Sequence, residues 1–204
     1  MDKSDVSAGR QISAPSLDEL RESARALNFE LSESELEMYA AFVTPMVADY
    51  QLVESMEDPR LPVTYPRGEG YRPAPDENTL NAWYWKCAIT GAQTGKLAGK
   101  RIVVKDNICI AGLPMMNGSN VWEGFIPEQD ATVVTRVLAA GGEILGKAVC
   151  ENFCFSGGSH TSATGPVQNP HNSEHMSGGS SSGCAALIVA GECDMAIGGD
   201  QGGS

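Results

Sequence analysis

Two glycine-flanked serine clusters stand close together near the carboxyl end of the sequence, and a serine hydroxyl is a common nucleophile in acyl transfer. The first cluster, Gly179–Gly183, matches the G-x-S-x-G pattern of a nucleophile elbow, with Ser181 at its centre. An elbow of that kind needs an acid and then a histidine later in the chain, whereas all three histidines precede Ser181. A nucleophile at Ser181 therefore stays open only if residues beyond this chain supply the base.

The second cluster, Asp200–Ser204, follows an apolar run that is expected to form a buried strand. Glycine adopts backbone angles that are closed to other residues, so successive N–H groups in such a turn can point at one spot. That arrangement would hold an oxyanion beside the Ser204 hydroxyl. A plain turn is an equally good interpretation of the same residues.

Lys105 ends the apolar run Ile102-Val103-Val104 and precedes Asp106 and Asn107. A lysine at the end of a buried strand is costly to desolvate unless it is paired or neutral, and a neutral amine is a general base. The alternative is a strand-end lysine that reaches solvent. The residues around Lys105 do not decide between these two interpretations.

Taken together, the lysine motif and the two serine clusters resemble those of the amidase signature family. The motifs that carry the resemblance are V-K-D-N at 104–107, G-G-S-S-S-G at 178–183 and G-G-D-Q-G-G-S at 198–204, with supporting matches at 111–119, 151–153 and 165–170. The likeness covers about residues 80–204 and is closest in appearance to bacterial enantioselective amidases of nitrile-degrading pathways. Gly199 departs from the family, many of whose members have serine or threonine there.

The resemblance implies a role for each matching residue. Ser204 would be the nucleophile, Lys105 the base, and Ser180, after a non-proline cis peptide bond, the relay between them. Backbone N–H groups of Gln201, Gly202 and Gly203 would form the oxyanion hole. The remaining residues with an implied role, in support or in lining the substrate pocket, are Ser181, Cys154 and Phe155.

The implied activity is hydrolysis of small-molecule linear amides to the acid and ammonia, without a metal or organic cofactor. A glutamine-hydrolysing amidotransferase subunit is an alternative, as is an α/β-hydrolase with Ser181 as its nucleophile. The implied fold is α/β, a mixed central sheet flanked by helices and preceded by a helical segment. Since the family continues into a long carboxyl-terminal half, we expect this chain to be the N-terminal part of a longer protein.

Charge and composition divide the chain. Most of the net charge of −12 lies in residues 1–80, which we expect to be an acidic α-helical segment with a proline-rich linker at 58–78; residues 81–204 would belong to the catalytic domain. The acidic balance argues against nucleic-acid binding. No apolar run is long enough for a membrane helix. No signal peptide is evident, so we expect a cytoplasmic protein whose cysteines are reduced.

The periodicity of apolar residues predicts the elements. A first helix is expected at 17–27, capped by Ser16 with Glu19. A second is expected from Ser32 or Ser34 to Tyr50, with a break at Pro45. Further helices are expected at 80–92, 132–140 and 184–190. Strands are expected at 101–104, 143–148 and 195–198. The apolar stripe of the second helix suits packing within the chain or against a second copy, so we expect a homodimer. A non-enzymatic scaffold working through residues 1–57 is a further alternative.

Overall fold

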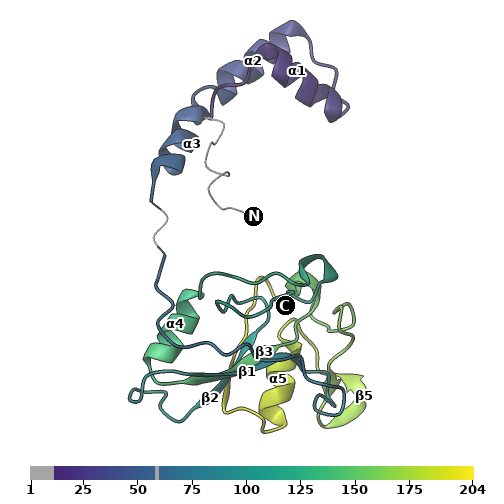
Figure 1. Ribbon diagram of the computed structural model, residues 1–204. Coiled ribbons are helices and arrows are strands. Elements are labelled where there is room, and N and C mark those ends of the chain that lie inside the picture. The colour runs from purple at the N-terminus through teal and green to yellow at the C-terminus, as the bar shows by residue number, and fades with distance from the viewer. Residues whose placement is uncertain (1–11, 58–59) are drawn as a thin grey trace. The chain divides into compact units, whose positions relative to one another are not determined.

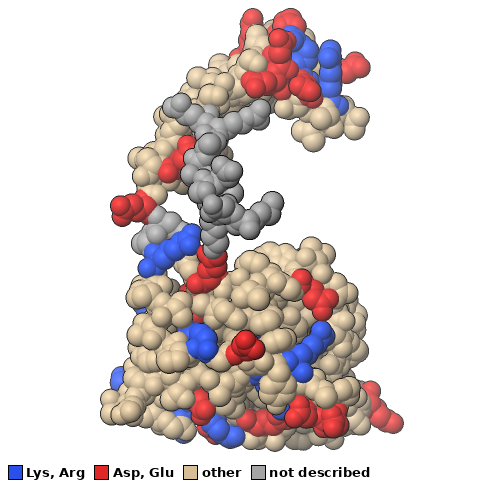
Figure 2. All heavy atoms as spheres, in the orientation of Figure 1, with Lys and Arg blue, Asp and Glu red and all other residues tan. Residues whose placement is uncertain are grey.

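The computed structural model describes residues 12–57 and 60–204, which fall into two compact units divided before Arg60. In the first unit, α1 (Leu17–Ala26) begins at Ser16 with the expected capping box to Glu19. A second capping box, formed by Ser32 and Glu35, begins α2 (Glu33–Val43). The helix breaks as expected at Pro45, where α3 (Met46–Ser55) begins. Figure 2 shows acidic side chains gathered over α1 and α2 beside a small basic group.

The second unit is built on a mixed four-stranded sheet with the order β1-β3-β2-β6. Strands β2 (Arg101–Lys105), β3 (Glu143–Ala148) and β6 (Met195–Ile197) run parallel, and β1 (Trp83–Thr90) runs antiparallel to β3. Helices α4 (Thr132–Ala139) and α5 (Ser182–Val189) cover opposite faces (Figure 1). The remaining elements are two 3₁₀ turns, η2 (Asn120–Trp122) and η3 (Asn152–Cys154), and the hairpin β4 (Gln168–Asn169) with β5 (Asn172–Met176).

The alternation of side chains along β2 divides the core in two. Ile102 and Val104 pack with α4, whereas Val103 packs on the opposite face with α5. Lys105 follows Val103 by two residues and therefore faces α5. The predicted strands and the helices at 132–140 and 184–190 are confirmed, with small differences at their ends, and the α/β class with a mixed sheet is confirmed as well.

The expected helix at 80–92 is wrong, because its residues form β1. Trp83 pairs with Ala148 and Trp85 with Lys147, so the aromatic run forms a strand antiparallel to β3. Aromatic side chains favour a pleated, half-buried surface, and pairing with β3 outweighs the weak helical periodicity of this stretch.

Residues 60–80, which we expected to belong with the N-terminal segment, fall in the second unit, where Tyr71 pairs with Lys86. No helix among the described residues is long and apolar enough to span a membrane.

Candidate active site

Lys105 and Ser180 form a buried pair at the carboxyl end of β2. Both residues are 0% exposed, and the Lys105 amine donates to Ser180 Oγ over 2.6 Å and to the Gly199 carbonyl over 3.1 Å. The Gly179–Ser180 peptide bond is cis. Of the two interpretations of Lys105, the structure therefore supports the buried, paired lysine.

The start of α5 brings Ser180 to the lysine. A side-chain carbon at Gly183 would lie 2.4 Å from the Ala82 carbonyl oxygen and 2.7 Å from the Val149 nitrogen, so a glycine is needed for α5 to approach the sheet this closely. Ser181 ties the same turn to the loop after β6, since its hydroxyl lies 3.1 Å from both the nitrogen and the carbonyl oxygen of Gly199. Ser181 thus holds two loops together.

Ser204 and Ser180 line the same hollow. The hollow is about 320 Å³, and its other lining residues include Ser181, Asp200 and Gly203. The Ser204 hydroxyl donates to the Ser156 carbonyl over 2.6 Å and lies 3.1 Å from the Cys154 carbonyl. Within the described residues no hydrogen bond joins Ser204 to Ser180, so a direct proton path requires the Ser204 hydroxyl to turn.

The backbone N–H groups of the Gly-Gly-Ser turn converge on one atom, as the glycines allow. That atom is Oδ1 of Asp200, which accepts from Gly202 over 2.9 Å, Gly203 over 2.6 Å and Ser204 over 3.3 Å. These bonds, first from Gly203 and then from Gly202, lower the pKa of Asp200 below its usual value. The turn therefore directs three N–H groups at one spot, which the carboxylate of Asp200 occupies.

Cys154 and Phe155 point in different directions. Cys154 is 4% exposed and its thiol lies 3.4 Å from Asn117 Oδ1, whereas Phe155 is 90% exposed. Phe155 lines a separate hollow of about 410 Å³ together with Phe153 and Glu151. The two residues that we expected to line one pocket thus contribute to different surroundings.

Glu151 lies in the supporting match at 151–153, to which the sequence assigned no role in the site. Its side chain accepts from the Ser156 N–H over 2.8 Å and from the Thr161 hydroxyl, and its own N–H donates to the Ser180 carbonyl over 3.1 Å. Since the Ser156 carbonyl accepts from Ser204, Glu151 connects the segments that carry both serines. Glu151 is the one charged residue in the mostly apolar stretch Val149–Phe155, and this is the sequence signal for such a buried carboxylate.

A buried ion pair stands on the opposite face of the sheet from Lys105. Lys147 Nζ lies 2.9 Å from Asp106 Oδ1, with side chains 0% and 1% exposed. The other Asp106 oxygen accepts the N–H groups of Met116 and Asn117 over 3.0 and 2.8 Å. These contacts of Asp106 hold the backbone in place directly after Lys105.

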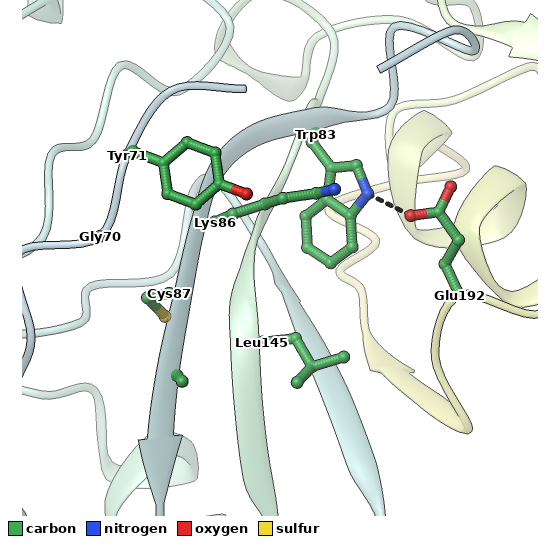
Figure 3. A pocket seen from close by; sticks show the side chains of 8 residues that line it. Gly70, Tyr71, Trp83, Lys86, Cys87, Leu145 and Glu192 are labelled. Atoms are coloured by element: carbon green, nitrogen blue, oxygen red, sulfur yellow. Dashed lines mark hydrogen bonds between the residues drawn. The ribbon is translucent and has the colours of Figure 1, made fainter. Parts of the chain in front are cut away.

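A further hollow of the second unit lies elsewhere. It measures about 480 Å³ and is lined by residues of β1 and β3 together with Tyr71 and Glu192 (Figure 3). The Trp83 indole donates to Glu192 over 2.6 Å, and the Lys86 amine lies 5.3 Å from the centre of the Trp83 ring. This hollow shares no residue with the Lys105, Ser180 and Ser204 cluster, so its size does not make it the candidate site.

Residues 70–204 match the family model described as Amidase. The chain belongs to the amidase family. It is 45% identical over 178 residues to the enantioselective amidase of Rhodococcus rhodochrous, a match that covers 86% of this chain and 34% of that enzyme. It is 46% identical over 110 residues to a glutamyl-tRNA(Gln) amidotransferase subunit of Methanosarcina mazei, covering 54% of this chain and 23% of the relative.

A solved structure agrees with this assignment. The corresponding glutamyl-tRNA(Gln) amidotransferase subunit of Thermotoga maritima has a TM-score of 0.50 and 34% identity, over 53% of this chain and 24% of that one. The chain thus spans about a third or less of the relatives that it matches. The family assignment confirms the resemblance, and it leaves the α/β-hydrolase alternative with Ser181 as nucleophile without support.

Proposed function

We propose that the full-length protein hydrolyses carboxylic acid amides to the acid and ammonia through an acyl-enzyme. Ser204 is the nucleophile, Ser180 the relay and Lys105 the base. The observation that carries this proposal is the 2.6 Å contact between the amine of Lys105 and the hydroxyl of Ser180, both fully buried. Burial excludes water from the pair, so a proton leaving Ser180 has the lysine amine as its acceptor.

The reaction begins when the Ser204 hydroxyl turns from the Ser156 carbonyl toward Ser180. As its oxygen attacks the amide carbon, its proton passes to Ser180, whose own proton passes to the neutral amine of Lys105. The resulting ammonium returns the proton through Ser180 to the leaving nitrogen, so that ammonia departs. Water then attacks the acyl-enzyme by the same relay, which regenerates Ser204 and releases the acid.

The oxyanion of the tetrahedral intermediate is assigned to the N–H groups of Gln201, Gly202 and Gly203. Two of these, Gly202 and Gly203, already point at a common focus, which Asp200 Oδ1 occupies. The carboxylate must therefore release them when the oxyanion forms. Each donor of this kind is worth roughly 3 kcal/mol of transition-state stabilisation.

Substitution of the three residues in the full-length protein tests the proposal. We expect Ser204→Ala to abolish both hydrolysis and the acyl-enzyme, detected by mass spectrometry, and Lys105→Ala and Ser180→Ala to lower kcat by a factor of at least about 100, as expected for loss of general-base catalysis. Ser173→Ala, which changes an exposed serine of β5, is the matched control. Wild-type activity in Ser204→Ala would contradict the proposal.

The same enzyme preparation separates the amidase from the amidotransferase alternative. The similarity to the Rhodococcus amidase extends over 86% of this chain, against 54% for the Methanosarcina protein, and therefore includes part of the first unit. We accordingly expect turnover of aliphatic and aromatic amides without added subunits. Turnover of glutamine alone, and only with partner subunits present, would favour the amidotransferase.

We also propose that two copies of the full-length protein associate through the first unit. Helices α2 and α3 expose large apolar side chains, among them Met38, Phe42, Tyr50, Leu52 and Val53, which are 57% to 70% exposed. A second copy would cover such a surface.

The six cysteines are free, a state typical of a reducing compartment, and this supports a cytoplasmic location.

A further inference from the structure

The segment Phe153–Ser156, which we call the bend, turns sharply beside Ser204. Phe153 and Cys154 both have positive backbone angles, with φ of 49° and 56°. Residues other than glycine rarely adopt this left-handed conformation, and it persists where the surrounding contacts impose it. The bend presents two carbonyl groups to the proposed nucleophile: the Ser204 hydroxyl donates to that of Ser156 over 2.6 Å and lies 3.1 Å from that of Cys154. The position of the Ser204 oxygen therefore depends on the bend.

Glu151 holds the bend at two points. Its backbone carbonyl accepts from the Cys154 N–H over 2.9 Å, and its carboxylate accepts from the Ser156 N–H over 2.8 Å. A buried carboxylate needs hydrogen-bond donors, and Glu151, which is 1% exposed, has the Ser156 N–H and the Thr161 hydroxyl. The carboxylate and the bend thus fix each other.

The same residue is also bonded to the relay. The Glu151 N–H donates to the Ser180 carbonyl over 3.1 Å, and the Ser180 hydroxyl in turn lies 2.6 Å from the Lys105 amine. Glu151 is therefore connected directly to Ser180 and, through Ser156, to Ser204. Transfer of a proton between two hydroxyls requires their oxygens to approach within hydrogen-bond distance, so the placing of these two segments matters for the reaction.

We propose that Glu151 is a positioning residue that acts on Ser204 through Ser156. Its carboxylate keeps the bend in the conformation that fixes the Ser204 oxygen in the hollow that Ser180 also lines. The start of the reaction then requires a turn of the hydroxyl and no movement of the backbone. Glu151 itself touches no reacting atom and exchanges no proton. This inference rests on the proposed function and names a residue that positions its nucleophile.

Covalent labelling of Ser204 by phenylmethanesulfonyl fluoride tests the inference in the full-length protein, because it reports the reactivity of the Ser204 oxygen. Fluoride leaves as this oxygen bonds to sulfur, and mass spectrometry follows the labelled fraction. Glu151→Leu keeps most of the side-chain volume and removes the acceptor of the Ser156 N–H. We expect this variant to slow labelling and to lower kcat by at least about tenfold with little change in KM, since a small displacement of a reacting group has effects of that size or larger.

Two further variants separate positioning from a general loss of stability. Glu151→Gln keeps an acceptor for the Ser156 N–H and a donor toward the Thr161 hydroxyl, so it should label within about threefold of the wild-type rate. Ser159→Ala is the matched control, because the buried Ser159 hydroxyl also accepts a backbone N–H, that of Val167 over 3.1 Å. It should lower the urea concentration of unfolding and leave the labelling rate unchanged.

The outcomes are distinct. Labelling of folded Glu151→Leu at the wild-type rate would overturn the inference, as would equal slowing in Ser159→Ala. If Glu151→Leu does not fold, Glu151→Gln still decides, because a loss of about tenfold in that variant would assign the effect to the charge and not to the bend.

A wild-type protein that is not labelled at Ser204 would instead contradict the proposed function. Deuterium exchange of the backbone amides at 152–158 then tests the hold of Glu151 on the bend by itself. Exchange should be faster in Glu151→Leu than in Ser159→Ala, and equal exchange in the two variants would overturn the inference.

Discussion

The ion pair of Lys147 and Asp106 lends itself to a quantitative test of what holds the end of β2 in place. Substitution of Lys147 by methionine keeps most of the side-chain volume and removes the charge. It leaves the Asp106 carboxylate 1% exposed without its cation. Neither Lys147 Nζ nor Asp106 Oδ1 has another hydrogen-bond partner among the described residues, so no neighbour takes over the lost interaction.

The magnitude follows from what remains around the carboxylate. Breaking a buried pair by removal of one partner costs about 3–5 kcal/mol, because an uncompensated charge stays buried. Asp106 keeps two backbone donors, the N–H groups of Met116 and Asn117, on its other oxygen. We therefore place the loss at the lower end, about 3 kcal/mol in the free energy of unfolding.

Urea unfolding of the full-length protein, followed by tryptophan fluorescence, measures this loss. Trp85 is a suitable reporter, because it pairs directly with Lys147 in the sheet. The double variant Asp106→Asn/Lys147→Met removes both charges and should recover about 2 kcal/mol relative to the sum of the single variants. Glu123→Gln is the control: it breaks the exposed pair with Arg72 and should cost no more than about 1 kcal/mol.

Unfolding of Lys147→Met at the same urea concentration as Glu123→Gln would refute a stabilising role for the ion pair. It is equally refuted if the double variant is as unstable as the sum of the single variants, since the two charges would then act independently. Loss of amide hydrolysis in Lys147→Met without a loss of stability would show that the pair positions Lys105 without holding the fold together.

Two further predictions concern Glu151 and the first unit. Burial alone would raise the pKa of Glu151, but the hydrogen bonds from Thr161 and Ser156 outweigh it and hold the pKa below its usual value. The stability that Glu151 contributes is therefore present above the ordinary glutamate pKa of about 4.3 and is lost as the pH falls through the lowered value. In that pH range the stability of Glu151→Gln should depend less steeply on pH than that of the wild type, as measured by acid unfolding. Identical acid-unfolding curves for the two proteins would contradict the role of Glu151. For the dimer, sedimentation of the full-length protein should give two copies, whereas Phe42→Glu should give one; an unchanged dimer would place the interface elsewhere.

The sequence predicted the parts of the fold that depend on neighbouring residues. Ser16 with Glu19 begins α1 through a local capping box, and the run from Ile102 to Val104 forms a strand because its side chains are stiff and apolar. The stretch from Trp83 onward was wrong as a helix, because its state depends on pairing with β3, a partner some sixty residues away.

The candidate site divides in the same way. The motifs around Lys105, Ser180 and Ser204, with their order and spacing, are properties of the sequence, and they were enough to predict the family that the comparisons show. Whether Lys105 is solvated or buried against Ser180 was not decided by its neighbours in sequence. That depends on how closely α5 approaches the sheet at Gly183.

The tertiary structure alone decided which groups surround these three residues. The sequence gives no sign that Asp200 occupies the focus of the Gly-Gly-Ser turn, or that Glu151 joins the two serine segments. The physical reason is that a side chain's type and local spacing fix which bonds it is able to form. Its partners are chosen by the packing of distant segments, which also sets the burial that makes those partners necessary.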